Sequence, residues 1–259
     1  MKPKNAFDYA ISRAKHSLQL YELLHNTRQR QIRSDWARKF KELMHWPIKN
    51  KIERIDGNKS LSILLLREEA GINRKHFTDE YLSELLRSSL VNCVAALDRY
   101  FHDIVLLHCL NAASKPEVKK ELRELYVPLC DVVNAIKTIR NNKTARPGNA
   151  IKKVIQDILH KDYTFQGPDA IVKASKMLGI DDFWGKVSDA MSLNKDMLIK
   201  KHREIINRRN QIVHEADIER KIKAKILTKR PINKKYAEEA CALIEKLVEE
   251  ANKIFESKY

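Results

Sequence analysis

The sequence predicts an all-α fold, a helical bundle with additional N-terminal and inserted helices. Leu, Ile, Ala, Lys, Arg and Glu dominate the 259 residues, and most of these are good helix formers. Only 6 glycines and 7 prolines interrupt the chain. No segment alternates convincingly between apolar and polar residues, as a half-buried strand would. With 43% hydrophobic residues, the chain is long enough for one large domain, or for a domain with an appendage.

Residues 1–75 are expected to form an N-terminal helical extension. Two helices are predicted here, at 5–26 and 34–46, and Pro47 ends the second. After a polar stretch, the apolar segment SLSILLLREEA predicts a short helix that ends at Gly71.

Residues 76–259 are expected to form the main helical domain. Thr78 caps the first helix, which runs to about residue 113. Inserted helices are expected between about 114 and 191, at 116–127, 129–142, 148–161, 168–178 and 181–191. A long helix at 194–217 follows, and Asn233 caps the final one.

On the helix expected at 194–217, an arginine falls inside the apolar stripe. At 100° per residue, one arc holds the apolar side chains Leu198, Ile199, Ile205, Ile206, Ile212 and Val213. Arg209 and His202 fall inside this arc, while Asn210 lies at its edge and His214 just beyond it. Burying a guanidinium costs on the order of several kcal/mol unless a carboxylate, a phosphate or dense hydrogen bonding meets it. Arg209 therefore belongs either to a functional site or to a core Arg–Asp bridge accompanied by a surface histidine.

The long helix from Thr78 offers a partner for this arginine. Asp98 lies at the edge of that helix's apolar stripe, so we expect Asp98 to pair with Arg209 and orient it. Arg209 and His214 lie about 140° apart around their own helix. They can converge only around a shared ligand or across an interface with a second copy of the chain.

The charge balance indicates a polyanionic partner. The formal net charge is +16, which favours nucleic acid first and an anionic membrane surface second, with a merely basic protein as the alternative. Residues 200–235 hold 13 Lys and Arg residues against four acids, around the Arg209 segment. Such a run is either a solvated surface or a contact surface for phosphates. The candidate RNA contacts are Lys201, Arg208, Arg220, Lys221 and Lys223.

Other function classes find little support in the sequence. Four scattered cysteines form no C-x-x-C pair, so we expect reduced thiols in a cytoplasmic protein, no metal site and no cofactor. The N-terminus has charges where a signal peptide needs an apolar core. No apolar run reaches the roughly 18 residues of a membrane-spanning helix, so no membrane partner is expected. Glycine-rich phosphate-binding motifs are also absent from the sequence.

Two tryptophans, Trp36 and Trp46, stand among basic residues: Arg33, Arg38, Lys39 and Lys41. Such aromatic side chains can stack on nucleobases beside phosphate contacts. From the sequence we favour the alternative, in which both rings anchor an amphipathic helix to the core.

The segment from Arg209 through Asn210 and Ile212 to His214 resembles the R-x4-H motif of the HEPN superfamily, small α-helical domains of many prokaryotic defence and toxin systems. Upstream, SSLVNCVAALDRYFHDIV is similar to the first core helix of the branch named for its likeness to RNase L, RiboL-PSP-HEPN. The resemblance covers roughly residues 77–258. It implies a HEPN-like helical bundle that dimerises, with the two Arg–His motifs meeting at a shared cleft.

The resemblance also implies metal-independent endoribonuclease activity, in defence or in a toxin–antitoxin pair with an antitoxin or another regulatory partner. In this scheme the catalytic residues are His214 as general acid or base, Arg209 as the phosphate ligand and Asn210 as an orienting or hydrogen-bonding group, while Asp98 supports Arg209. Cleavage through the ribose 2′-OH leaves 2′,3′-cyclic phosphate and 5′-hydroxyl ends. The alternatives are a non-catalytic HEPN domain that binds RNA or acts as a scaffold, and a DNA-binding accessory protein.

Overall fold

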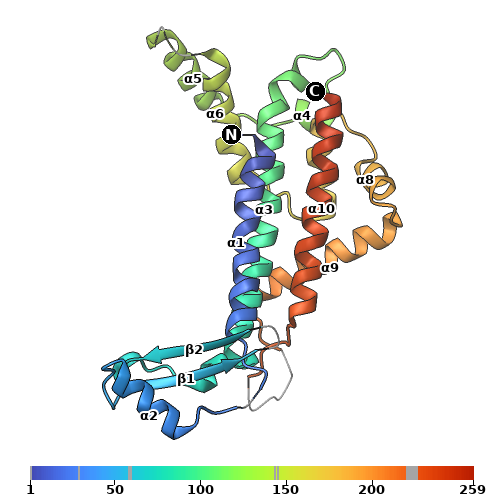
Figure 1. The fold of residues 1–259 in the computed structure, drawn as a ribbon. Coiled ribbons are helices and arrows are strands. Elements are labelled where there is room, and N and C mark those ends of the chain that lie inside the picture. Colours follow the sequence, from blue (N-terminus) through green and yellow to red (C-terminus); the bar gives the residue numbers. More distant parts are fainter. Residues whose placement is uncertain (1, 29, 58–59, 143, 145, 220–226) are drawn as a thin grey trace.

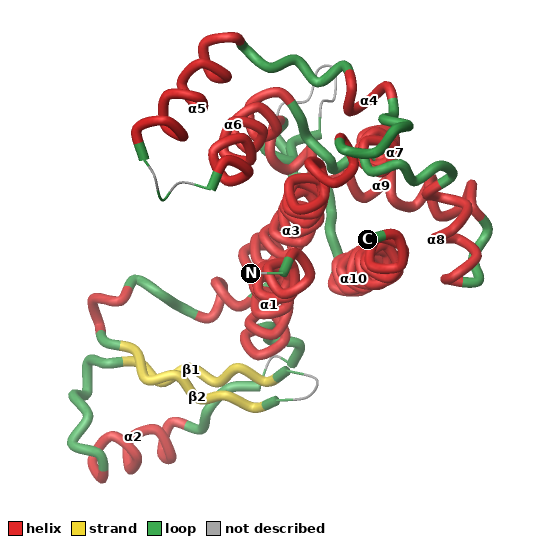
Figure 2. Tube along the Cα trace, turned by 90° about the horizontal axis from the view of Figure 1, so that it is seen from above, coloured by secondary structure: helices red, strands yellow, loops and turns green. Residues whose placement is uncertain are grey.

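The computed structural model describes the whole chain except residues 1, 29, 58–59, 143, 145 and 220–226. Its centre is formed by three long helices, α1 (Pro3–Leu24), α3 (Asp79–Ala113) and α10 (Lys234–Lys258), which run side by side (Figure 1). Seen along their axes, these helices occupy the middle of the molecule and the other elements surround them (Figure 2). The predicted all-α fold class is confirmed.

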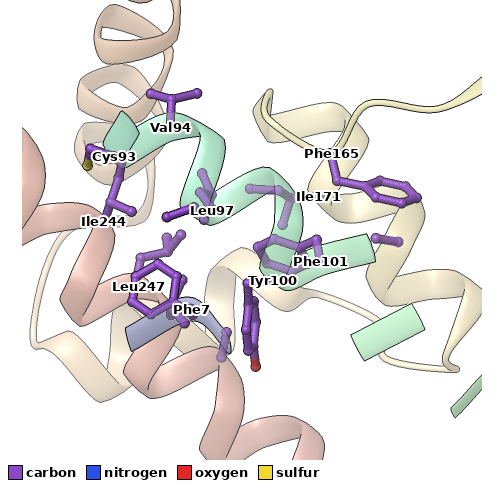
Figure 3. Packing of buried hydrophobic residues seen from close by; sticks show 14 of the residues in the cluster. Phe7, Cys93, Val94, Leu97, Tyr100, Phe101, Phe165, Ile171, Ile244 and Leu247 are labelled. Carbon is purple, nitrogen blue, oxygen red and sulfur yellow. The ribbon is translucent and has the colours of Figure 1, made fainter. Parts of the chain in front are cut away.

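The first helix belongs to the central core. Its buried residues recur at steps of four and three, one helical face, in the series Phe7, Ile11, Ala14, Leu18 and Tyr21. This face packs against α3 and α10, and the Phe7 ring meets Tyr100 edge-on with the ring centroids 6.1 Å apart (Figure 3). The N-terminal helix is therefore part of the bundle, in contrast to the extension expected for residues 1–75.

A β-hairpin replaces the short helix predicted before Gly71. Strand β1 (Lys51–Asp56) pairs with β2 (Leu61–Leu66) in an antiparallel register that places Asp56 opposite Leu61. Along β2, exposed and half-buried residues alternate, which is the period of a strand. The helix prediction was wrong here because a short apolar run fits either period until a pairing partner is known. Helix α2 (Ser34–Leu43) lies beside this hairpin at one end of the bundle (Figures 1 and 2).

The remaining helices lie around the other end and the side of the bundle (Figure 1). They are α4 (Lys120–Arg123), α5 (Leu129–Asn141), α6 (Pro147–Asp162), α7 (Pro168–Met177), α8 (Phe183–Met191) and α9 (Lys195–His214). Two short 3₁₀ turns, η1 (Glu68–Ala70) and η2 (Arg74–Phe77), connect the hairpin to α3. None of the described helices is both long and apolar enough to cross a membrane.

Candidate functional site

Helix α9 begins and ends with identifiable local signals. The side chain of Asn194 accepts a hydrogen bond from the amide of Met197, at 3.0 Å, and so caps the first turn. After His214 the chain leaves the helix through Ala216 and Asp217, whose φ angles are +50° and +57°. The helix thus stops three residues before the expected end at 217. Few residues adopt this left-handed backbone without support, although aspartate tolerates it better than most.

The support for this turn is a buried ion pair around Asp217, which is only 1% exposed. Arg208 donates from both terminal nitrogens to its carboxylate, the Nη2–Oδ2 distance being 2.9 Å. Arg87 of α3 donates from Nε to the same carboxylate at 2.5 Å. Burial by itself would raise the pKa of Asp217, but the hydrogen bonds from Arg208 and then Arg87 outweigh it and hold the pKa below its usual range. Asp217 is therefore a carboxylate shared between two guanidinium groups.

The same cluster ties together the two ends of the connection between α9 and α10. Nη2 of Arg87 donates to the backbone oxygen of Arg230 at 2.8 Å, and the amide of Arg230 donates to the backbone oxygen of Asp217 at 2.8 Å. The amide of Glu219 donates to the backbone oxygen of Thr228 at 2.8 Å. The basic segment between these positions consequently begins and ends at a short backbone ladder directly after α9.

Two sequence-based expectations change at this point. A buried cluster of charges does join the end of α9 to α3. In this cluster Asp217 pairs with both Arg208 and Arg87, whereas the sequence predicts a pair of Arg209 with Asp98. Asp98 lies 11 residues beyond Arg87, about 16 Å further along α3 at 1.5 Å per residue. Arg208 is expected to contact RNA, but in the structure its guanidinium forms an ion pair with the buried carboxylate of Asp217.

Asp98 serves another part of the fold. Its Oδ1 accepts a hydrogen bond from the amide of Phe165 at 2.6 Å, and Oδ2 accepts one from Nε2 of Gln166 at 3.4 Å. Its Oδ1 also lies 3.6 Å from Nε2 of His102. Asp98 therefore holds the connection between α6 and α7, and the predicted pairing with Arg209 is wrong.

Arg209 is half-buried, and its charge is not neutralised by an acid. Nη1 donates to Oδ1 of Asn210 at 3.0 Å, which is a neutral partner. The buried Nε has no hydrogen-bond partner. Within the described part of the chain, no carboxylate lies within ion-pair distance of this guanidinium. A half-buried cation in this state is suited to receive an anion.

His214 is exposed at the last position of α9, one helical turn after Asn210. In the described structure no hydrogen bond joins it to Arg209 or to Asn210, and Arg209 and His214 point about 140° apart around the helix. Among the predicted RNA contacts, Lys201 is exposed on the same helix. Arg220, Lys221 and Lys223 lie outside the described residues.

The other histidine inside the apolar arc, His202, is a core residue. His202 is 1% exposed, and both of its ring nitrogens lack hydrogen-bond partners. The centroid of its ring lies 5.3 Å from the ring centroid of Trp184. Burial, with a smaller contribution from the charge of Arg203, lowers its pKa to about 4. His202 is therefore neutral at physiological pH and closed to solvent, whereas the side chain of His214 is exposed.

Sequence reasoning missed Asp217 and its contact with Arg87. Arg87 does fall at the edge of the apolar stripe of α3, which is a usable signal for a buried charge. Asp217 gives no such signal, because it follows the helix and lies nine positions after Arg208. Within the described ranges, no three His, Cys, Asp or Glu side chains gather closely enough to hold a metal ion.

Comparison with known proteins gives one result. The family model RiboL-PSP-HEPN matches residues 55–253, a range that begins at the end of β1, includes β2 and ends within α10. No curated protein and no solved structure matches the chain.

Proposed function

The chain belongs to the RiboL-PSP-HEPN family, and from this premise we propose that it is a metal-independent endoribonuclease whose catalytic residues are Arg209, Asn210 and His214. The family resemblance expected from the sequence is confirmed, and it supports an RNA-related HEPN domain. The proposal goes further by assigning cleavage, the residues that perform it, and a cytoplasmic role in defence or in a toxin–antitoxin pair.

One observation carries the proposal: neighbouring arginines on α9 have opposite environments. Arg208 is neutralised by Asp217, whereas Arg209 has only the amide of Asn210 as a partner and keeps a buried Nε without one. An uncompensated guanidinium is costly unless it meets an anion in the working protein. A phosphodiester is such an anion, and a guanidinium can grip two of its oxygens at once.

The chemistry follows from the two side chains. A neutral imidazole of His214 removes the proton of the ribose 2′-OH, and the oxygen attacks the adjacent phosphorus. The new P–O2′ bond forms as the P–O5′ bond breaks, and a protonated imidazole returns a proton to the leaving 5′ oxygen. Arg209 meets the negative charge that develops on the non-bridging oxygens during this exchange. The products carry 2′,3′-cyclic phosphate and 5′-hydroxyl ends.

A homodimer completes this scheme. Arg209 and His214 diverge around one helix, and a single exposed imidazole cannot act as base and acid in the same displacement. Two antiparallel copies of the end of α9 would place two imidazoles and two guanidinium groups around one phosphate. We therefore propose that the active site lies at a cleft between two copies of the chain.

The test is cleavage of a labelled mixed RNA in EDTA, comparing the wild type with His214→Ala and identifying the product ends. His16→Ala, which removes an exposed histidine from α1, is the matched control. We expect cyclic phosphate from the wild type and the control, and none from His214→Ala. Equal cleavage by His214→Ala would disprove the assignment. Intact RNA binding without cleavage by the wild type dimer would instead favour a non-catalytic RNA-binding or scaffolding domain.

A further inference from the structure

A small pocket is lined by residues at the start of α2 and residues of the hairpin. The hairpin and α2 lie at one end of the bundle (Figure 1). The volume of the pocket is about 300 Å³, and its walls include Trp36, Arg33 and Arg54, with the strand residues Leu61 and Ile63 as apolar surface. This volume lies at the lower end of the range of small-molecule sites. A flat aromatic wall, an apolar base and two guanidinium groups form a site for one planar, negatively charged unit.

The Trp36 ring is oriented before any ligand arrives. It stacks on Phe40, one helical turn further along α2, with the ring centroids 5.0 Å apart and the planes inclined by 19°. Trp36 is 43% exposed, so the interpretation of this ring as a core anchor, favoured from the sequence, is wrong. One face of the indole rests on Phe40, which leaves the other side of the ring for a stacked ligand.

The cations around this ring are only partly neutralised. Nη2 of Arg54 donates to Asp56 at 2.9 Å, while its buried Nε has no hydrogen-bond partner. Arg33 and Arg38 are exposed and have no carboxylate within ion-pair distance in the part of the chain that the structure describes. Between residues 26 and 56 the sequence has nine Lys and Arg residues against four Asp and Glu. The charge of this region is complementary to a phosphate backbone.

We propose that this pocket binds one nucleotide of a single-stranded RNA, with the base stacked on Trp36 and the phosphate near Arg33 and Arg54. The inference rests on the proposed function, because it supplies that activity with a separate substrate-holding site. Stacking on an indole accepts any base, so the pocket would favour unpaired RNA over a particular sequence.

The position of the pocket is consistent with a shared substrate. The amides of Thr27 and Arg28 each donate to the backbone oxygen of Asp56 at 3.1 Å, which ties the hairpin to the end of α1. At the same end of the bundle, Tyr21 of α1 and Arg230 of the connection after α9 line one surface hollow. An RNA strand bound at the hairpin therefore lies at the same end of the bundle as the end of α9.

The experiment measures binding of a fluorescent 12-nucleotide oligouridine RNA in a His214→Ala background, where RNA is not cut. We expect Trp36→Ala to weaken binding about 5- to 150-fold, the range that follows from the loss of one base–aromatic stack. Tyr126→Ala removes an aromatic side chain that is more exposed than Trp36 and does not line the pocket, and we expect binding within about twofold of the parent for this control. Equal affinities of the two variants would overturn the proposal.

Two further readouts separate stacking from charge and from misfolding. Trp36→Phe keeps a stacking ring, so it should retain the affinity while abolishing the quenching of tryptophan fluorescence that RNA causes in the parent. Heparin carries negative charge without bases, and its affinity should be insensitive to Trp36→Ala. An equal loss of affinity for heparin and RNA would show charge attraction alone and overturn the stacking site.

Failure of this inference can be told apart from failure of the proposed function. If the wild type cleaves RNA and Trp36→Ala does not change RNA affinity, the pocket proposal is rejected and the nuclease proposal stands. If Trp36→Ala weakens RNA binding and the wild type does not cleave RNA, the pocket proposal stands and the nuclease proposal is rejected.

Discussion

Arg208 holds the carboxylate of Asp217 with both terminal nitrogens, across a turn in which Asp217 has a left-handed backbone. The contact determines where α9 ends and so where His214 stands. Arg87 reaches the same carboxylate from α3, and through it the end of α9 is attached to the bundle. The next residue, Arg209, takes no part in this pair and remains available for an anion.

We expect Asp217→Asn to lower the free energy of unfolding by about 3–5 kcal/mol, because it removes the negative charge that two largely buried guanidinium groups share. Urea denaturation followed by circular dichroism measures this change. Glu249→Gln, which breaks an exposed pair with Lys253, is the control and should cost less than about 1 kcal/mol. Similar losses in the two variants would contradict a structural role for the Asp217 cluster.

Arg208→Ala and Arg209→Ala should have opposite effects. Arg208→Ala removes a partner of buried Asp217 and should destabilise the protein by about 3 kcal/mol. Arg209→Ala breaks only a bond to Asn210, so its free energy of unfolding should stay within about 1 kcal/mol, while RNA cleavage falls at least about 100-fold. Urea denaturation and RNA cleavage assays on both variants measure these two effects. A cleavage rate unchanged in folded Arg209→Ala would remove this residue from the catalytic site.

His202 should make the protein sensitive to mild acid. Its pKa is lowered from 6.5 to about 4 in the folded state, so the unfolded chain binds more protons between these two pH values. Stability is therefore highest above pH 6.5 and falls as the pH drops towards 4, by about 3 kcal/mol at most. His202→Leu should flatten this part of the stability profile. The same slope in the variant and the wild type would show that other groups cause it.

The acid sensitivity from Asp217 should appear at lower pH. Its pKa is held below 3.8, so the stability that its two arginine partners contribute is present above that value and is lost as the pH falls through the folded-state pKa. In the His202→Leu variant, unfolding below about pH 4 should therefore persist. Adding Asp217→Asn should weaken the pH dependence of stability in this lower window, measured by urea denaturation at each pH.

Asp98→Ala should affect stability and not cleavage. The substitution removes the acceptor for the amide of Phe165, and hydrogen bonds to a charged group contribute about 1.5–3 kcal/mol. Thermal or urea unfolding checks this loss, with the exposed α6 residue Asp157→Ala as the control. A specific loss of cleavage in fully folded Asp98→Ala would revive the expected link to Arg209.

The local pattern of apolar residues in the sequence was sufficient to predict most of the helices and the helix that carries the Arg209–His214 motif. Apolar periodicity located the helix of Arg209, Asn210 and His214, since this signal acts within a few residues. The hairpin was missed because Leu61–Leu66 becomes a strand only when β1 supplies its hydrogen-bond partners. The sequence favours Trp36 as a core anchor, because periodicity alone does not reveal that α2 lies at the end of the bundle with none of its residues buried.

The sequence by itself determined the helical class, the family and the presence of the Arg209–His214 motif on one amphipathic helix. The tertiary structure decided which arginine is neutralised. Arg87, Arg208 and Asp217 are far apart in the chain or separated by a turn, and they meet only because α9 packs on α3. Electrostatic pairing depends on distances of a few ångströms, which sequence spacing does not specify beyond one helix.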